Sequence, residues 1–218
     1  MLIPITHYND LDARKLMDIY SESNYKNTDY FYPNILDKNE SIRKIEENFL
    51  DYLKEKFFKL DEAVYWILEN EGMWVSALRV SKIQTALYYL EALETRPDKR
   101  EKGYATLLLS GVVASLKKRG PFLLCDCVSK QNSASLHVHQ RCGFQIVSDE
   151  GYNYLNEKAS NHHFGLQYIY MRDNTHILIK RIFSSQGMPF VTSSLKKKKA
   201  FHTQSQFEQN LSFLYGEQ

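Results

Sequence analysis

A short basic turn, Arg100-Glu101-Lys102-Gly103-Tyr104-Ala105, is the feature that most constrains how this chain can fold. It follows a strand-like segment that ends at Thr95. It precedes apolar residues at the spacing of one helix face, namely Ala105, Leu108, Leu109, Val112, Val113 and Leu116. The first N–H groups of a helix have no internal partner, and the helix dipole adds positive potential there. Gly103 lets the backbone approach a ligand closely. The sequence therefore predicts a strand, a turn and a helix that together bind a phosphate or pyrophosphate.

Two common phosphate loops do not match this turn. A dinucleotide fingerprint requires G-x-G-x-x-G and a Walker loop requires G-x-x-x-x-G-K-[ST], whereas the turn contains R-x-x-G-x-A. A second block runs from Asn132 to Phe144 and follows the pattern N-x-x-S-x-x-x-H-x-x-x-G-F. The two blocks, in this order, resemble the GNAT family of acetyl-CoA-dependent N-acyltransferases, and the resemblance extends roughly from Val64 to Arg172. The alternative is a basic turn followed by an ordinary core helix.

The order of the expected elements predicts an α+β fold. A strand near the N-terminus and two helices are followed by three strands, a helix, a strand, a helix and two strands, at 2–8, 10–20, 41–60, 63–69, 73–80, 86–95, 103–119, 122–128, 133–142, 144–148 and 164–171. Strands joined by a helix, 86–95 and 122–128, are expected to be parallel neighbours. The resemblance implies a GNAT-like mixed, mostly antiparallel sheet of about seven strands flanked by helices. In that fold the parallel pair splays apart around the pantetheine arm. We expect an acetyltransferase domain over 1–173 and a C-terminal extension over 174–218, with a strand-like run at 177–179 and a lysine block at 196–199.

Composition excludes several classes of protein. A chain of 218 residues with 43% hydrophobic residues is long enough for one domain with a proper core. The net charge of +2 is too small to indicate a nucleic-acid partner. No apolar run approaches the length that spans a bilayer, and the N-terminus lacks the features of a signal peptide. Three cysteines, two of them one residue apart, do not form a disulfide framework. We therefore expect a reduced, cytoplasmic protein, and the sequence leaves a homodimer open.

Acetyl transfer from a thioester to an amine requires a neutral amine, donors for the oxyanion and a proton for the departing thiolate. Glu91 is the candidate base, acting directly or through water, because the resemblance implies a glutamate base at this strand position. Period-2 alternation in its strand places Tyr89, Glu91, Leu93 and Thr95 on one face. The alternatives for Glu91 are a surface glutamate and an anchor for the ammonium group of the substrate.

The resemblance also implies how the coenzyme is bound. The backbone N–H of Leu93 is expected to stabilise the oxyanion, and Leu93 and Thr95 to pair with the pantetheine amides. The turn residues Arg100, Glu101, Lys102, Gly103, Tyr104 and Ala105 are expected to bind the pyrophosphate, mostly through main-chain N–H groups. Asn132 and Ser135 are expected to contact the coenzyme, although Asn132 is equally well explained as a helix N-cap.

His139 stands where many members of the family have a tyrosine that protonates the coenzyme thiolate. Histidine can donate that proton, but it is also explained as a spacer or core residue. Tyr30, Tyr32 and Tyr89 are the candidates for the acceptor site, and packing under a loop or in the core explains them as well. The cysteines and histidines have no metal-ligand spacing, so we expect no metal.

These observations predict an N-acetyltransferase that moves an acetyl group from acetyl-CoA to a primary amine of a small molecule by direct attack in a ternary complex. Two alternatives remain. One is a non-catalytic acyl-CoA sensor that keeps the coenzyme turn but lacks turnover. The other is an acetyltransferase that acts on a protein amine. The sequence does not identify the acceptor.

Overall fold

The structure is a computed structural model that describes residues 1–153, 157–158 and 161–171. The chain divides into two compact units, which we treat separately. The first unit contains residues 1–81 and 92–111, and the second contains residues 82–91 and 112–218. The boundary expected between a domain at 1–173 and an extension at 174–218 lies outside the described residues, as do the strand-like run at 177–179 and the lysine block.

A seven-stranded sheet with the order β1-β2-β3-β4-β5-β9-β6 forms the framework. Its strands are β1 (Leu2–Ile5), β2 (Val64–Asn70), β3 (Met73–Gln84), β4 (Leu87–Thr95), β5 (Phe122–Ser129), β6 (Gln145–Ser148) and β9 (His163–Tyr170). Strands β4 and β5 pair in parallel, with Leu87–Tyr89 in register with Leu123–Cys125. The pairs β1–β2, β2–β3, β5–β9 and β6–β9 are antiparallel. A second, two-stranded sheet contains β7 (Tyr152–Asn153) and β8 (Glu157–Lys158). The predicted mixed, mostly antiparallel sheet with one parallel pair is confirmed.

Three helices precede the sheet's central strands, and their ends differ from the sequence prediction. They are α1 (Ala13–Lys26), α2 (Thr28–Phe31) and α3 (Lys38–Glu55). Helix α1 begins later than expected because Asp12 is its N-cap and accepts a hydrogen bond from the Lys15 N–H at 3.0 Å. It also continues to Lys26, beyond the expected end at residue 20. Helix α3 ends at Glu55, and a 3-10 turn at Phe57–Lys59 completes the expected helical region.

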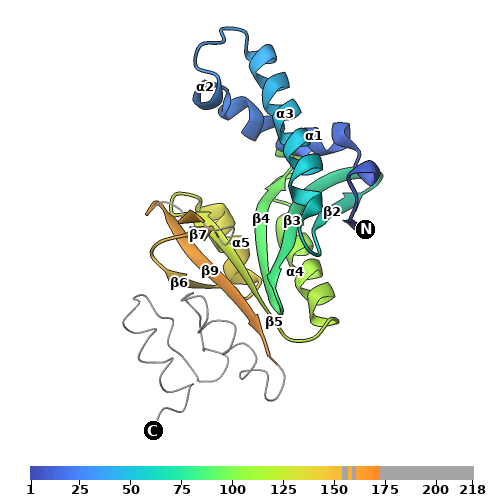
Figure 1. The fold of residues 1–218 in the computed structure, drawn as a ribbon, viewed down its shortest axis with the longest axis vertical. Coiled ribbons are helices and arrows are strands. Elements are labelled where there is room, and N and C mark those ends of the chain that lie inside the picture. The colour runs from blue at the N-terminus through green and yellow to red at the C-terminus, as the bar shows by residue number, and fades with distance from the viewer. Residues whose placement is uncertain (154–156, 159–160, 172–218) are drawn as a thin grey trace. The chain divides into compact units, whose positions relative to one another are not determined.

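Helices flank the strands of the first unit (Figure 1), and side chains on both faces of β2 are buried. Tyr65 and Ile67 of β2 belong to a core cluster with residues of α1, α3 and β1. Their neighbours in β2, Trp66 and Leu68, are also buried and point to the opposite face because side chains alternate along a strand. On that face a Cβ added to Gly111 of α4 (Tyr104–Lys117) would lie 3.1 Å from the Leu2 side chain. Helices therefore cover both sides of these strands.

The second unit is built on β5, β9 and α5 (Ser133–Arg141). The end of α4 contributes Val112, Val113 and Leu116, which are buried as the apolar spacing predicts. Phe122 of β5 stacks on Tyr168 of β9 with ring centres 5.9 Å apart. This core fixes the strand that carries the polar groups described below.

Candidate active site

The turn between β4 and α4 has the conformation of an open, ligand-accessible loop. A 3-10 turn at Pro97–Lys99 leads into it, and Glu101 and Gly103 have left-handed backbones with φ of 62° and 78°. A Cβ added to Gly103 would meet nothing within 4 Å, so the space beside it is open. The Leu107 N–H donates to the Gly103 carbonyl at 2.9 Å, and this bond begins the ladder of α4. The turn thus presents an exposed backbone at a helix N-terminus, the arrangement that binds anions.

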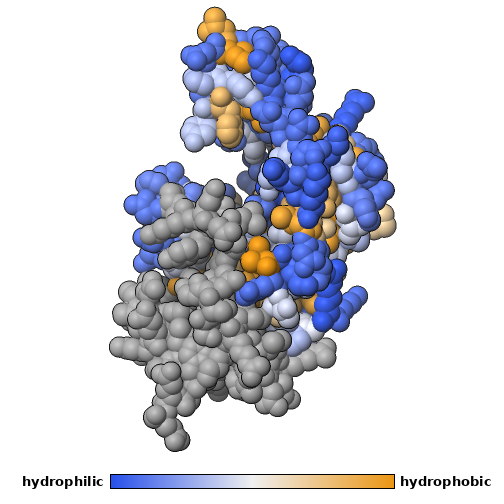
Figure 2. Space-filling model, viewed as in Figure 1, coloured by the Kyte–Doolittle hydropathy of each residue, from blue (hydrophilic) through white to orange (hydrophobic). Residues whose placement is uncertain are grey.

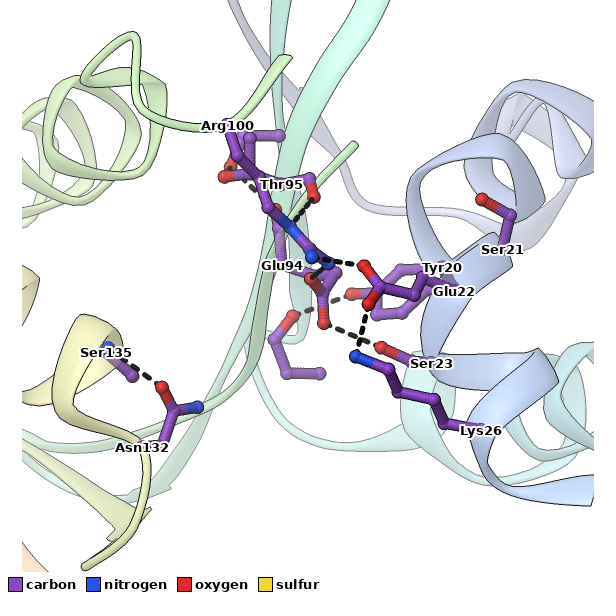
Figure 3. Close-up of polar contacts among 12 residues, drawn as sticks. Tyr20, Ser21, Glu22, Ser23, Lys26, Glu94, Thr95, Arg100, Asn132 and Ser135 are labelled. Carbon is purple, nitrogen blue, oxygen red and sulfur yellow. Dashed lines mark hydrogen bonds and ion pairs between the residues drawn. The ribbon is translucent and has the colours of Figure 1, made fainter. Parts of the chain in front are cut away.

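The Arg100 side chain does not extend beside the helix start. Its guanidinium turns back onto β4 and α1 (Figure 3), where Nη2 lies 3.0 Å from Glu94 Oε1 and Nη1 pairs with Glu22. Its Nε also donates to the Thr95 carbonyl at 3.3 Å. Glu94 accepts a further bond from the Ser23 hydroxyl at 2.9 Å. In this structure Arg100 therefore joins α1 to the end of β4, while the neighbouring Lys102 is exposed.

Strand β4 contains a left-handed residue that the sequence does not signal. Ala92 has φ of 54°, in a conformation that costs a residue with a Cβ about 1–2 kcal/mol. Its carbonyl accepts a hydrogen bond from the Tyr20 hydroxyl at 2.7 Å, and the Tyr65 hydroxyl donates to the Tyr20 hydroxyl at 2.7 Å. Buried hydrogen bonds contribute about 0.5–1.5 kcal/mol each, so this pair is sufficient to offset the strain. The strict alternation expected for Tyr89, Glu91, Leu93 and Thr95 is interrupted at Ala92.

Beyond Ala92, the predicted coenzyme residues Leu93 and Thr95 are half-buried. The hydroxyl of Ser76 in β3 donates to the Glu94 carbonyl at 2.6 Å and lies 3.0 Å from Thr95 Oγ1. The Arg96 N–H donates to the Val75 carbonyl at 2.9 Å. These contacts hold the end of β4 against β3.

In the second unit, Tyr89 lies where β4 pairs with β5, and Glu91 follows at the centre of β4. Tyr89 is 6% exposed, and its pKa is raised above the ordinary value, first by burial and then by the charges of Cys127 and Asp126. The Glu91 carboxylate adds to this effect, and its Oε2 atom is buried. Tyr89 is therefore a buried, neutral hydroxyl near Cys127, Asp126 and Glu91.

The second sequence block forms the predicted helix with a capped N-terminus. Asn132 Oδ1 accepts a hydrogen bond from the Ser135 N–H at 3.0 Å, so the N-cap interpretation of Asn132 is confirmed (Figure 3). One turn later His139 is fully buried. Its Nδ1 lies 2.8 Å from the Ser135 carbonyl, and its Nε2 lies 2.7 Å from Asp126 Oδ2.

The pKa values of both members of the Asp126–His139 pair are raised above their ordinary values. Burial lowers the pKa of His139, but the hydrogen bond and the charge of Asp126 more than compensate, and the pKa is raised overall. Burial raises the pKa of Asp126 by more than His139 lowers it. Because both ring nitrogens of His139 have partners, the prediction that it protonates the coenzyme thiolate gains no support from this geometry.

The two predicted acceptor residues of the first unit lie at α2. Tyr30 is 81% exposed, and its ring packs edge-on against Phe31 with centres 5.1 Å apart. The hydroxyl of Tyr32 accepts a hydrogen bond from Asn48 of α3. Tyr25 and Leu36 are also exposed, and Figure 2 shows orange, hydrophobic atoms among blue ones in the part of the surface where Figure 1 places α2.

Two further properties bear on the chemistry. Within residues 1–153, 157–158 and 161–171, no three His, Cys, Asp or Glu side chains gather where they could hold a metal ion. No helix in the same ranges is both long and apolar enough to cross a membrane.

Three residues with evident roles were not identified from the sequence. For Tyr20 and Tyr65 the sequence pattern indicates only burial, because they lie on the inner faces of α1 and β2. Asp126 had no signal beyond its place between two cysteines, and only the fold brings it to His139.

Comparison with known proteins agrees with this arrangement. The sequence matches the model of the acetyltransferase (GNAT) family over residues 16–144. No curated protein matches it. Among solved structures, the PaiA N-acetyltransferase of Thermoplasma acidophilum in complex with coenzyme A has a TM-score of 0.51 at 16% identity, over 78% of this chain and 99% of that one.

Two other solved structures are similar to the same extent. The ribosomal-protein-S18-alanine N-acetyltransferase of Escherichia coli has a TM-score of 0.52 at 14% identity, over 80% of this chain and 98% of that one. The N-acetyltransferase PseH of Campylobacter jejuni in complex with acetyl coenzyme A has a TM-score of 0.50 at 13% identity, over 78% and 99%. Identities this low establish the shared fold alone. The family model covers more than half of the chain, and this protein therefore belongs to the GNAT acetyltransferase family, a family of acyltransferases.

Proposed function

We propose that this protein transfers the acetyl group of acetyl-CoA to a primary amine by direct attack in a ternary complex. The observation that carries the proposal is the R-x-x-G-x-A turn, with left-handed Glu101 and Gly103 and an exposed backbone at the start of α4. An anion at this position gains both hydrogen bonds and a favourable helix dipole. The structures of PaiA and PseH contain coenzyme A and acetyl coenzyme A, which supports the same class of ligand here.

The turn, in this proposal, binds the pyrophosphate through the main-chain N–H groups of 101–105, with Lys102 adding charge. Arg100 contributes indirectly: its hydrogen bond to the Thr95 carbonyl holds the end of β4 in place, and its guanidinium does not contact the phosphates. Leu93 and Thr95 pair with the pantetheine amides. Asn132 and Ser135, at the start of α5, contact the coenzyme. These assignments rest on the family resemblance together with the positions described above.

The chemical step has simple requirements. The amine nitrogen attacks the thioester carbonyl, and the Leu93 N–H stabilises the oxyanion that forms. The carbon–sulfur bond then breaks, the thiolate leaves, and the proton of the attacking amine passes to Glu91 directly or through water. Glu91 suits this role because it lies at the centre of β4 with one carboxylate oxygen buried. In our proposal His139 positions Asp126 and α5 and is not itself the acid.

The class of acceptor has two candidates. A small amine is the first, as the sequence predicts. A protein amine is the second, because Tyr30 and Phe31 are exposed rather than enclosed in a pocket. The E. coli S18-alanine N-acetyltransferase, which has the same fold, is named for a protein acceptor.

Turnover assays test the proposed function. Release of free thiol from acetyl-CoA would be followed with a panel of small amines and with peptides that carry a free N-terminus or lysine. Acetylation of at least one acceptor, lost in Glu91→Gln and retained in the exposed control Glu71→Gln, supports an acetyltransferase. Saturable coenzyme binding without turnover on any acceptor would instead identify a sensor.

A further inference from the structure

The peptide bond between Ala92 and Leu93 is held by two buried tyrosines of the first unit. Tyr20 comes from the inner face of α1 and is 7% exposed, whereas Tyr65 comes from β2 and is fully buried. The Tyr65 hydroxyl donates to the Tyr20 hydroxyl, which donates to the Ala92 carbonyl, at 2.7 Å each. Helix α1 and strand β2 thus each contribute one hydroxyl to the hydrogen-bond chain that ends at a carbonyl in the middle of β4.

The rings of both tyrosines are fixed by packing. Tyr20 lies against Phe49 of α3 with ring centres 5.3 Å apart, and Tyr65 packs edge-on against Phe57 at 5.9 Å. Arg79 lies over three aromatic rings of the same cluster, 5.0 Å from the Tyr52 ring centre. Neither hydroxyl can move without disturbing the core, so the direction of the hydrogen bond to Ala92 is set by the fold.

The Tyr20 hydroxyl is also a permanent donor. Burial is the largest cause that raises its pKa well above the ordinary value, and Tyr65 raises it further. The hydroxyl therefore keeps its proton at neutral pH and can donate to the Ala92 carbonyl.

The geometry of a peptide bond transfers this constraint to Leu93. The chain has no cis peptide bond among its described residues, and a trans peptide directs its C=O and its N–H to opposite sides. A hydrogen bond that fixes the Ala92 carbonyl therefore also fixes the direction of the Leu93 N–H, away from Tyr20. A donor to the carbonyl polarises the same amide, which strengthens its N–H as a donor.

We infer that Tyr20, supported by Tyr65, is a positioning residue that orients and polarises the Leu93 N–H toward the thioester carbonyl of acetyl-CoA. The inference rests on the proposed function, in which this N–H stabilises the oxyanion. It explains why two tyrosine hydroxyls, from elements far apart in the sequence, are buried beside an alanine with a left-handed backbone.

Infrared difference spectroscopy tests this inference without knowledge of the acceptor. Acetyl-CoA labelled with ¹³C at the thioester carbonyl would be bound to the wild type and to Tyr20→Phe. A hydrogen bond lowers the stretching frequency of a carbonyl. We expect the wild type to lower the frequency relative to free acetyl-CoA, and Tyr20→Phe to lose most of that shift. Its affinity for acetyl-CoA should stay within about threefold, since one weakened hydrogen bond contributes little to the total binding free energy.

Tyr8→Phe is the matched control, because Tyr8 packs edge-on against Phe58 in the same unit and is not part of the hydrogen-bond chain from Tyr65 through Tyr20 to Ala92. It should keep the wild-type frequency. Tyr65→Phe leaves the bond from Tyr20 to Ala92 in place and should lose part of the shift. If Tyr20→Phe does not fold, Tyr65→Phe decides the matter, and an unchanged frequency there overturns the inference.

The possible failures are distinct. If the wild type does not bind acetyl-CoA, the proposed function is wrong. If it binds and Tyr20→Phe shows the wild-type frequency, the proposed function stands and Tyr20 has only a structural role.

Discussion

At the scale of single residues, Gly72 and Gly103 show how one backbone conformation serves two purposes. Gly72 lies in the β2–β3 hairpin with φ of 77°, and Gly103 lies in the β4–α4 turn with φ of 78°. Both positions are exposed, and a Cβ at either one meets nothing within 4 Å. The two glycines therefore have similar backbone strain and differ in the turn in which they lie. A substitution at Gly72 is a natural control for the same substitution at Gly103.

Gly103→Ala and Gly72→Ala should lose similar stability, about 1–2 kcal/mol, because each forces a residue with a Cβ into the left-handed region. Only Gly103→Ala should weaken the binding of coenzyme A, by about tenfold or more, which corresponds to about 1.4 kcal/mol. Urea unfolding and calorimetric titration with coenzyme A would measure the two effects. Equal affinity in both variants would remove the turn from the coenzyme site.

Glu91→Gln should lower the rate of acetyl transfer, with the largest loss at low pH, and leave coenzyme affinity intact. The physical reason is that a neutral amide cannot accept the proton of the attacking amine. The pH dependence of kcat/KM on the best acceptor from the panel would test this. A profile that keeps the wild-type shape would show that Glu91 is not the base.

At the scale of elements, charged side chains join α1 to the end of β4. Arg100 pairs with Glu22 of α1 and Glu94 of β4, while Arg96 pairs with Asp18 of α1 at 3.0 Å. The neighbouring Lys102 is exposed and lies in the turn itself. Arg100 and Lys102, which look equivalent in the sequence, therefore have different structural roles.

This difference predicts separable phenotypes. Lys102→Gln should weaken coenzyme A binding in a salt-dependent way and leave the unfolding midpoint unchanged, because an exposed cation contributes mainly through long-range attraction. Arg100→Gln should lower both the affinity and the unfolding midpoint, since it removes the tie between α1 and β4. Calorimetry at two salt concentrations and thermal melts would distinguish them. Identical effects of the two substitutions would show that the ion pairs of Arg100 are unimportant.

The pair of Asp126 on β5 and His139 on α5 makes stability depend on pH. The pKa of His139 is raised in the folded state, so the folded protein binds more protons than the unfolded chain above about pH 6.5, the ordinary value for histidine. The raised pKa of Asp126 acts in the same direction. The stabilisation that His139 contributes is complete below about pH 6.5 and should be lost as the pH rises through the folded-state pKa of His139. Urea unfolding of the wild type and of His139→Gln across this range would test it, and parallel curves would contradict it.

At the scale of the whole molecule, local patterns predicted the order of the main elements and the turn between β4 and α4. The apolar spacing of α4, the N-cap Asn132 and the helix that joins β4 to β5 each produce a strong local signal, and the parallel pairing followed from them. The left-handed backbone of Ala92 could not be predicted, because alanine usually avoids it and the contacts that hold it come from Tyr20, which is 72 residues away. The partners of His139 were missed for the same reason, since only the fold brings Asp126 to its ring.

The central claim is that the backbone between β4 and α4 binds the diphosphate of coenzyme A. Amide ¹H–¹⁵N NMR spectra recorded during a titration with coenzyme A test it most directly, because they report on each main-chain N–H separately. The account predicts that the amides of residues 101–105 shift progressively and saturate together. Shifts elsewhere in the chain that leave these amides unchanged, or no shifts at all, would contradict it.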